Sequence, residues 1–337
     1  MIRVGVVGLG MMGLTHLDIY HRNKRSEIAA ICDSDPARLH GEAKAAGNIE
    51  GQATFGVEQL HNVKRYTDPA ELFADADIDM VDVCLPTHLH LRFGLEAMRS
   101  GKHVMLEKPL ARTAADALKL AEGAEQAQGL VLIAHCMRFW PGWSWLRDAI
   151  ADQRYGKVLS ASFRRVATHP GGPFYLDGER SGGAALDLHI HDTDFVQFCF
   201  GMPKSVQSSG FAHITSAIDH IVTQYHYDDV PLVMAEGSWS MAAGFTFNMS
   251  YTVNFEQATL AYDLGRPEPL QIYREGTAQT MPVDAVMGYD LEIDYFLDCI
   301  ERGKRPETVT PQDAYRSVKL VEAEVQSVAE GRTVALE

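Results

Sequence analysis

The chain has 337 residues, of which 30 are basic and 45 acidic, so its formal charge is −15. This length suggests two domains with a large core, and the negative charge would repel a nucleic-acid backbone or an anionic membrane surface. Five widely spaced cysteines without a C-x-x-C pair predict buried thiols in a reducing compartment. Because no secretory leader precedes the first strand and no apolar run approaches the ~20 residues of a membrane span, we expect a cytoplasmic protein.

The first residues follow the order strand, glycine turn, helix. An apolar run at 2–7 is followed by Gly8-Leu9-Gly10-Met11-Met12-Gly13 and a helical pattern. In such a loop Gly8 permits the tight turn, Gly10 lets a pyrophosphate approach the backbone and Gly13 lets the helix pack closely on the strand. The pattern predicts that the loop, with Met11 and Met12 at the helix start, binds a dinucleotide.

A second predicted strand, 27–32, ends in Asp33, about 20 residues past the last glycine. At this position an acid accepts a hydrogen bond from the ribose 2′-hydroxyl and repels a 2′-phosphate, so the sequence favours NAD over NADP. Arg38 is the opposing feature. If it binds a phosphate rather than serving as an ordinary helical arginine, NADP becomes the alternative cofactor.

Alternation of strands and helices continues to about residue 134, which predicts a doubly wound parallel sheet, a Rossmann domain, over residues 1–128. Helices are predicted at 36–46, after Asp68-Pro69, after residue 90 as far as Ser100-Gly101, and at 113–128, strands at 80–85, 103–106 and 130–134, and a loop or small insertion at 47–64.

Polar residues follow the strand at 80–85, at the edge where open α/β sheets bind ligands. We expect Pro86, Thr87 and His90 to contact the cofactor. For His88 and His90 the alternative is that they are ordinary residues of a helix N-terminus, which is the commoner role.

Glu107-Lys108-Pro109 ends the next strand, so we expect Glu107 and Lys108 at the same edge. A lysine presented there needs a sharp, fixed turn, and we predict that the Lys108-Pro109 peptide is cis. The alternative is a surface lysine before a turn proline.

From about residue 155 long strands follow one another without helices, which favours a large open, mostly antiparallel sheet in a second α/β domain, residues 129–337. Strands are predicted at 157–165, 205–211, 220–227, 232–239, 245–255 and 258–263, and late helices at 289–301 and 311–330.

One helix is predicted to interrupt these strands from about residue 186. On it Asp187 and His191 are four residues apart and share a face, with Asp194 nearby. An imidazole beside carboxylates can act as a general base near neutral pH. The alternatives are a helix whose polar face is merely satisfied and a metal site that includes His189. We predict no metal, because residues two apart diverge on a helix and no cysteine or glutamate lies at ligand spacing.

Together these motifs resemble those of the Gfo/Idh/MocA family of glucose-fructose oxidoreductases and inositol dehydrogenases. The resemblance covers nearly the whole chain and rests on the glycine loop, on Gly101-Lys102-His103-Val104 with Glu107-Lys108-Pro109-Leu110-Ala111, and on Gly182-Gly183 before Asp187-x-x-x-His191. It implies a nucleotide domain and a mixed α/β domain whose sheet often packs against another subunit, hence a homodimer or homotetramer. It also implies that Lys108, Asp187 and His191 are catalytic. Where many members have glycine between the last two, this chain has His189.

The expected activity is therefore hydride transfer between NAD and a secondary alcohol of a sugar, cyclitol or related polyol. Polar and aromatic side chains suit a polyhydroxylated ring, whose hydroxyls each need a partner once desolvated. Candidates for substrate binding follow the strand at 130–134 or lie in the loop 167–181: His135, Arg138, Trp140, His169, Tyr175 and Arg180. The alternative is that these residues line an ordinary domain interface.

Other classes of function fit less well. The sequence has no G-x-S-x-G elbow, since Ser238 lacks that context, and no Walker lysine motif. Within the family, some members cleave glycosides by transient oxidation and elimination, and a few are non-catalytic regulators that bind the dinucleotide. The intact set of Lys108, Asp187 and His191 argues against a regulator and leaves the glycosidase as an alternative.

Overall fold

The computed structural model describes residues 1–42 and 55–336. The chain forms two compact units, the first from residues 1–135 and 289–315 and the second from residues 136–288 and 316–337. Our predicted boundary, between residues 128 and 129, precedes the first change of unit. Nothing in the sequence pattern indicated that residues 289–315 return to the first unit. No helix of the described ranges is long and apolar enough to cross a membrane.

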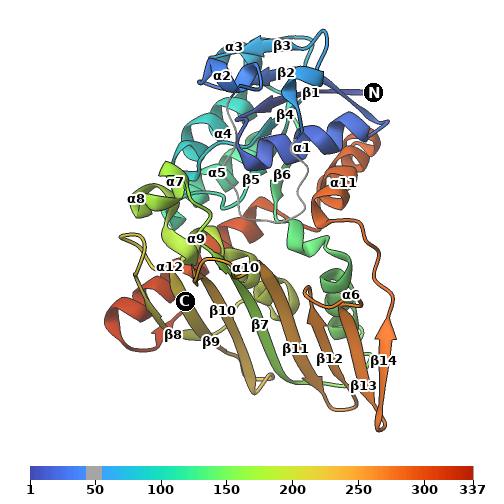
Figure 1. Cartoon of the computed structure of the whole chain (residues 1–337), viewed down its shortest axis with the longest axis vertical. Helices are drawn as coiled ribbons and strands as arrows, with labels where there is room; N and C mark the ends of the chain where they lie inside the picture. Colours follow the sequence, from blue (N-terminus) through green and yellow to red (C-terminus); the bar gives the residue numbers. More distant parts are fainter. Residues whose placement is uncertain (43–54, 337) are drawn as a thin grey trace. The chain divides into compact units, whose positions relative to one another are not determined.

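The first unit contains a six-stranded sheet whose paired strands are all parallel, in the order β3-β2-β1-β4-β5-β6 (Figure 1). The strands are β1 (Ile2–Val7), β2 (Ser26–Cys32), β3 (Lys64–Tyr66), β4 (Met80–Val83), β5 (His103–Glu107) and β6 (Val131–Ala134). β1, β4, β5 and β6 are almost wholly buried, which explains their continuous apolar runs. The predicted Rossmann sheet is confirmed.

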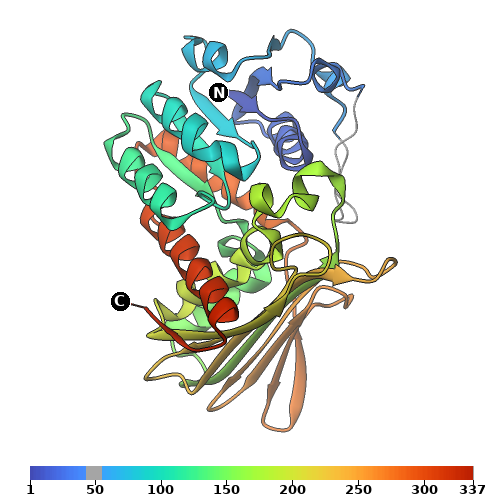
Figure 2. The same ribbon diagram turned by 90° about the vertical axis from the view of Figure 1, so that its left-hand side faces the viewer.

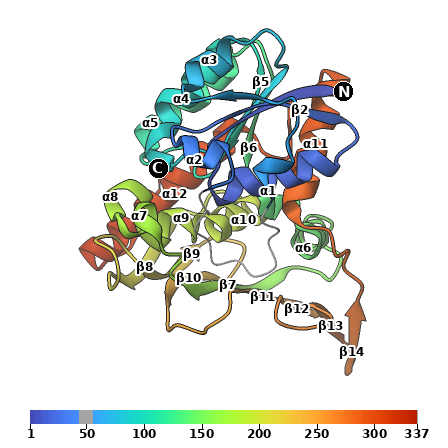
Figure 3. The same ribbon diagram turned by 45° about the horizontal axis from the view of Figure 1, so that its top comes forward.

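Six helices of the first unit are α1 (Met11–Arg22), α2 (Pro36–Leu39), α3 (Pro69–Ala74), α4 (His90–Arg99), α5 (Ala114–Gln126) and α11 (Gly288–Arg302), with short 3-10 turns at Val57–Gln59 and Thr87–Leu89. α11 lies beside α1 (Figure 3), where Asn23 Nδ2 donates to Asp294 at 2.7 Å. The helix predicted over 36–46 ends early, because the chain turns at Gly41 with φ of +77°, a conformation that favours glycine. Residues 43–46 of that prediction, and 47–54 of the predicted loop, lie outside the described residues.

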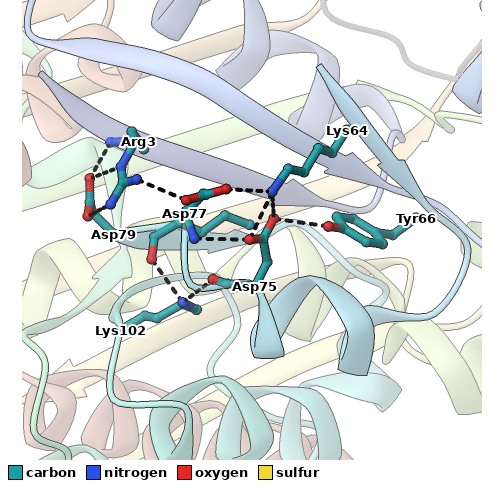
Figure 4. A network of polar contacts seen from close by, with 8 residues as sticks. Arg3, Lys64, Tyr66, Asp75, Asp77, Asp79 and Lys102 are labelled. Atoms are coloured by element: carbon teal, nitrogen blue, oxygen red, sulfur yellow. Dashed lines mark hydrogen bonds and ion pairs between the residues drawn. The ribbon is translucent and has the colours of Figure 1, made fainter. Parts of the chain in front are cut away.

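A network of ion pairs joins the strand starts of this sheet, at the edge opposite the carboxyl ends (Figure 4). Lys64 Nζ donates to Asp75 at 2.8 Å and to Asp77 at 2.9 Å, while Arg3 pairs with Asp79 at 2.8 Å. The hydrogen bond from Lys64 lowers the pKa of Asp75 to about 2. These contacts fix the turn between α3 and β4.

The second unit contains a nine-stranded sheet in the order β14-β13-β12-β11-β7-β10-β9-β8-β15. The strands are β7 (Val158–Thr168), β8 (Ser205–Phe211), β9 (His220–His226), β10 (Leu232–Met241), β11 (Asn248–Phe255), β12 (Thr259–Asp263), β13 (Leu270–Arg274), β14 (Thr277–Met281) and β15 (Val334–Ala335). β7 and β10 are parallel, and the pairs among the other strands are antiparallel. The predicted sheet is confirmed, although β3, β13, β14 and β15 had not been predicted.

The helices of the second unit are α6 (Pro141–Ala151), α7 (Gly172–Leu176), α8 (Gly178–Ser181), α9 (Gly183–Asp187), α10 (Ile190–Phe200) and α12 (Pro311–Glu330), with a 3-10 turn at Cys136–Arg138. α10 and α12 cover one face of the sheet (Figure 2). An aromatic core forms beneath them, where the Trp143 ring lies edge-on to Phe195 at 4.9 Å and to Tyr251 at 5.3 Å. Such edge-to-face pairs stabilise a core beyond the burial of their area.

Candidate dinucleotide and catalytic sites

The glycine loop has the geometry of a phosphate cradle. Gly8 has φ of +95°, and a Cβ at Gly13 would lie 1.8 Å from the Gly8 carbonyl oxygen. Gly10 differs, because a Cβ built there meets no atom within 4 Å in the described part of the chain. Gly10 also precedes α1 without a side-chain cap. The absence of a side chain at Gly10 and the uncapped start of α1 are the features that the close approach of a pyrophosphate requires.

Asp33 lies at the carboxyl end of β2 and is held by the glycine loop itself. Its Oδ2 accepts a hydrogen bond from Leu9 N–H at 2.8 Å and its Oδ1 accepts one from Asp35 N–H at 2.9 Å. Arg38 Nη1 lies 3.6 Å from Asp33 Oδ2. The structure therefore brings the two opposing specificity candidates, Asp33 and Arg38, into one place.

Pro86, Thr87 and His90, the cofactor candidates that follow β4, differ in burial and in their contacts. Thr87 is buried at the start of its 3-10 turn and Pro86 is half-buried. His90 is fully buried, and its Nδ1 and Nε2 lie 2.8 and 2.7 Å from the carbonyl oxygens of Pro109 and Leu85. Burial lowers the pKa of His90. Because both ring nitrogens face the backbone, this geometry does not support the predicted cofactor contact; His90 instead ties two loops together.

Lys108 follows β5 at the carboxyl edge of the sheet, and the predicted cis peptide before Pro109 is confirmed. Its side chain is half-buried, whereas Glu107 is buried. Glu107 Oε2 accepts a hydrogen bond from the Lys108 N–H at 3.0 Å, and Glu107 Oε1 lies 3.4 Å from His16 Nε2. The carboxylate is therefore engaged inside the unit, which does not support its predicted contact with the cofactor.

The expected single helix around Asp187 and His191 was wrong. Asp187 is the last residue of α9 and His191 is the second residue of α10. Between them the N–H groups of Leu188 and His189 both donate to the Ala184 carbonyl, at 3.0 and 2.8 Å, and the helix is interrupted. Asp187 and His191 are both half-buried in the second unit, whereas Lys108 belongs to the first.

His189 explains the interruption, because its ring turns into the core. A Cβ at Gly237 of β10 would lie 2.6 Å from His189 Nδ1, so only glycine leaves room for the ring. His189 Nε2 lies 3.4 Å from Glu324 of α12 and 3.4 Å from the Tyr225 hydroxyl. Burial lowers the pKa of His189 to about 3 and raises that of Glu324 to about 8. His189 is thus a core residue of this chain.

Asp194 is engaged by side chains from two other segments of the second unit. Arg138 donates to both of its carboxylate oxygens, at 2.9 and 2.7 Å, and Ser317 donates to it at 2.8 Å. Arg138 and Asp194 are buried, and the Arg138 guanidinium also lies over the Phe198 ring. These contacts give Arg138 a structural role and do not support its prediction as a substrate-binding residue.

Among the other substrate candidates, the structure brings His169 and Tyr175 together. His169 lies edge-on to the Trp239 ring at 5.0 Å, and Tyr175 lies 6.1 Å from the same ring. Trp140 is half-buried and Arg180 is exposed, both in the second unit. His135 is buried and is the last residue of the first of the two chain segments that form the first unit.

Sequence reasoning missed a buried polar cluster in the first unit. Asp82 of β4 accepts a hydrogen bond from the Tyr20 hydroxyl at 2.8 Å and lies 2.8 Å from His16 Nδ1. Cys84 Sγ lies 3.5 Å from the same ring nitrogen. Glu292 of α11 is also fully buried, and burial together with Glu107 and Asp82 raises its pKa. The available signal was an acid in the middle of the apolar strand at 80–85.

Ligand-type side chains gather closely at one place in this unit. Among the described residues, His16, Asp82 and Cys84 form a group whose possible metal-ligand atoms lie within 4.8 Å of one another, and neither His189 nor His191 belongs to such a group.

All five cysteines fall within the described residues and are free thiols. Cys199 is half-buried and the other four are buried.

A parallel sheet with an open glycine loop, an acid after β2 and a lysine after β5 defines the nucleotide-binding domain of an oxidoreductase. Residues 2–135 match the family model "Oxidoreductase family, NAD-binding Rossmann fold", and residues 147–336 match the model "Oxidoreductase family, C-terminal alpha/beta domain". The chain therefore belongs to the Gfo/Idh/MocA family and is an NAD-binding oxidoreductase.

Similar proteins cover the whole chain. An inositol 2-dehydrogenase of Rhizobium meliloti (strain 1021) is 28% identical over 352 residues, which span 99% of each chain. A 1,5-anhydro-D-fructose reductase of Ensifer adhaerens is 28% identical and spans 100% of this chain and 99% of its own. A levoglucosan dehydrogenase solved with NADH and levoglucosan has a TM-score of 0.85 at 18% identity, covering 100% of this chain and 99% of its own, and shares the fold.

Proposed function

We propose that this protein is an NAD-dependent dehydrogenase that reversibly oxidises a secondary alcohol of a cyclic polyol or sugar. The observation that carries the proposal is the placement of Lys108 after β5, at the same sheet edge as the open glycine loop. Support for the substrate class comes from the relatives, whose names include an inositol dehydrogenase and an anhydrosugar reductase. Support for NAD comes from Asp33 at the end of β2.

Each catalytic candidate has a chemical role in this proposal. When bound, NAD supplies the hydride acceptor. His191 takes the proton of the substrate hydroxyl as general base, and Asp187 orients or electrostatically supports its imidazole. Lys108 donates a hydrogen bond to the reacting oxygen, where charge develops. Trp140, His169 and Tyr175, together with His135 and Arg180, are the remaining candidates for binding the polyol.

Substitution of the acting groups tests these roles. Lys108→Met and His191→Ala should each lower kcat by about 100-fold or more, because groups that act mainly in the transition state contribute to kcat rather than to cofactor affinity. Steady-state kinetics measures kcat, and calorimetry should show NAD affinity nearly unchanged. Lys119→Met, an exposed lysine of α5 changed in the same way as Lys108, is the matched control outside the proposed catalytic and substrate-binding residues. Near-normal turnover in both catalytic variants would overturn the assignment.

A substrate screen tests the reaction class. Cyclitols, aldoses, sugar acids and anhydrosugars are incubated with NAD while the absorbance of NADH is followed. We expect net NADH with a polyol, since each ring hydroxyl can be matched by a polar partner. Turnover confined to aromatic alcohols or simple 2-hydroxy acids would contradict the polyol class. Release of sugar from a glycoside without net NADH would identify the glycosidase alternative, and NAD binding without any turnover would identify a regulator.

We also propose that the protein acts in the cytoplasm as a homodimer or homotetramer formed through the nine-stranded sheet. The long, regular sheet of the second unit, with α10 and α12 on one face, supports this arrangement. Localisation of a tagged full-length chain in cell fractions tests the compartment.

A further inference from the structure

The buried cluster of the first unit touches the backbone of Lys108. His16, on α1, has no exposed surface, and its ring lies between two carboxylates from neighbouring strands. His16 Nδ1 is 2.8 Å from Asp82 Oδ2, and His16 Nε2 is 3.4 Å from Glu107 Oε1. The other oxygen of Glu107 accepts the Lys108 N–H at 3.0 Å. A hydrogen bond at Asp82, a contact at ion-pair distance between His16 and Glu107, and a hydrogen bond to the Lys108 N–H thus link α1 to the peptide of Lys108.

The electrostatics of His16 and Glu107 favour the contact between them. Burial alone would lower the pKa of His16, but Asp82 and Glu107 outweigh it and the pKa is raised. Burial raises the pKa of Glu107, and the His16 charge opposes that change. The raised pKa favours a positive charge on the ring, which would offset the desolvation of the two carboxyl groups. Glu107 keeps an oxygen able to accept the Lys108 N–H in either protonation state.

Tyr20 is the natural comparison because it belongs to the same helix and the same cluster. Its hydroxyl donates to Asp82 at 2.8 Å and lies 3.7 Å from the Met105 sulfur. It is 1% exposed, as deeply buried as His16, but within the described residues its hydroxyl makes its hydrogen bonds with Asp82 and Met105 and none with Glu107. Substitution of either residue should therefore disturb the polar packing of the cluster. Only substitution of His16 should also remove the contact with Glu107, which holds the Lys108 N–H.

We infer that His16 is a positioning residue that fixes the Lys108 peptide through Glu107. The inference rests on the proposed function only in taking Lys108 as the acting lysine. A displacement of about 1 Å in a catalytic group can cost 100-fold in rate, so a carboxylate that holds the lysine's own N–H matters to the chemistry. Because α1 also carries the phosphate cradle at Gly10, the same helix serves the cofactor and the lysine.

The test compares His16→Gln with Tyr20→Phe in the full chain. Hydrogen exchange of the segment 103–112 should be about 10-fold or more faster in His16→Gln, since the Lys108 N–H loses its fixed acceptor, and nearly unchanged in Tyr20→Phe. With the best substrate of the screen, kcat should fall about 10-fold or more in His16→Gln, with KM and NAD affinity within about 2-fold of the unmodified protein. Equal effects in the two variants, or a parallel loss of NAD affinity, would overturn the inference.

A double-substitution cycle with Lys108→Met separates this inference from the proposed function. If His16 acts through Lys108, His16→Gln should lower the residual turnover of Lys108→Met by less than about 2-fold. The same fold-loss in both backgrounds would assign His16 a merely structural role. Normal turnover in Lys108→Met would instead contradict the proposed function. In that case hydrogen exchange of segment 103–112 would still test whether His16 fixes the Lys108 peptide. Should His16→Gln not fold, Glu107→Met, which removes the acceptor of the Lys108 N–H at a similar side-chain volume, takes its place in each comparison.

Discussion

At the scale of single residues, Asp33 is held ready before any cofactor arrives. Both carboxylate oxygens already accept backbone N–H groups, from Leu9 and Asp35. A side chain fixed in this way loses little further freedom on binding, which favours affinity. Its position also brings Arg38 within 3.6 Å, so that removal of the carboxylate would release the guanidinium.

We predict that Asp33→Ser shifts the preference from NAD toward NADP. NAD affinity should fall about 10-fold, the size expected for a lost hydrogen bond to a charged group, and NADP affinity should rise as Arg38 pairs with the 2′-phosphate. Calorimetric titration of both nucleotides measures the change. Asp35→Ser is the matched control, since Asp35 is exposed and also lies beside Arg38, at 3.9 Å. If the unmodified protein binds NADP as tightly as NAD, Arg38 or Ser34 governs the site.

The sequence predicted residues whose role follows from their place at a strand end or in a turn. Gly10, Asp33 and Lys108 are of this kind, because the order of elements determines which edge they occupy. Residues whose role depends on side-chain direction were not predictable in the same way. His90 and Arg138 each follow a strand that ends at the ligand edge of the sheet. However, the His90 ring lies against the carbonyl of Pro109, and the Arg138 guanidinium pairs with Asp194, 56 residues further along the chain.

At the scale of elements, periodicity predicted the long helices and strands well. α12 begins and ends at the predicted residues, 311 and 330, whereas the helix expected from residue 186 is divided. The division depends on the tertiary fit of His189 against Gly237, which no local pattern contains. The short strands β3 and β15, of three and two residues, are likewise too short for alternation to be visible.

The contact between α12 and the interrupted helix gives a pH-dependent stability. The pKa of Glu324 is about 8 in the folded protein, above its ordinary value, so the folded state holds a proton that the unfolded chain releases. Stability from this group is complete below the ordinary glutamate pKa and is lost as pH rises toward 8. His189 has a lowered pKa, about 3, so its contribution grows as pH rises from about 3 through its ordinary pKa near 6.5, and it changes little between pH 7 and 8.

We predict that Glu324→Gln removes this dependence. Between pH 6.5 and 8 the free energy of unfolding of the unmodified protein should fall more steeply than that of the variant, by up to about 1.4 kcal/mol per pH unit. Denaturant unfolding at several pH values measures the slopes. Glu322→Gln, in the same helix but exposed at a different face, should keep the slope of the unmodified protein. Parallel slopes for the unmodified protein and Glu324→Gln would contradict the assignment.

At the scale of the whole molecule, the nine-stranded sheet carries small and polar residues at exposed positions of its central strands. Ser162 of β7 and Thr252 of β11 are paired and exposed, and Arg164 Nε donates to Glu236 at 3.0 Å on the neighbouring strands. Small side chains allow another sheet to approach closely, at the spacing of about 10 Å that packed sheets adopt.

We therefore predict that the protein is an oligomer in solution and that Thr252→Arg weakens the assembly. A bulky charge at the centre of the sheet face would be buried without a partner if two sheets pack there. Light scattering after size-exclusion chromatography measures the mass. Gln126→Arg, an exposed neutral residue of the first unit changed in the same way, is the control. A single-chain mass for the unmodified protein, or no change in Thr252→Arg, would contradict this prediction.

The return of residues 289–315 to the first unit has a consequence for synthesis on the ribosome. α11 buries Ile293, Phe296 and Leu297 in that unit, along with Glu292. A nascent chain that has emerged as far as residue 135 has all six strands of the parallel sheet but lacks this helix, so its apolar and acidic contact surface remains uncovered. The unit that begins first is finished only after residues 136–288 of the second have been made. The order of translation therefore makes the amino-terminal unit depend on a late segment, and a truncated message would yield an incomplete nucleotide-binding unit that exposes core surface.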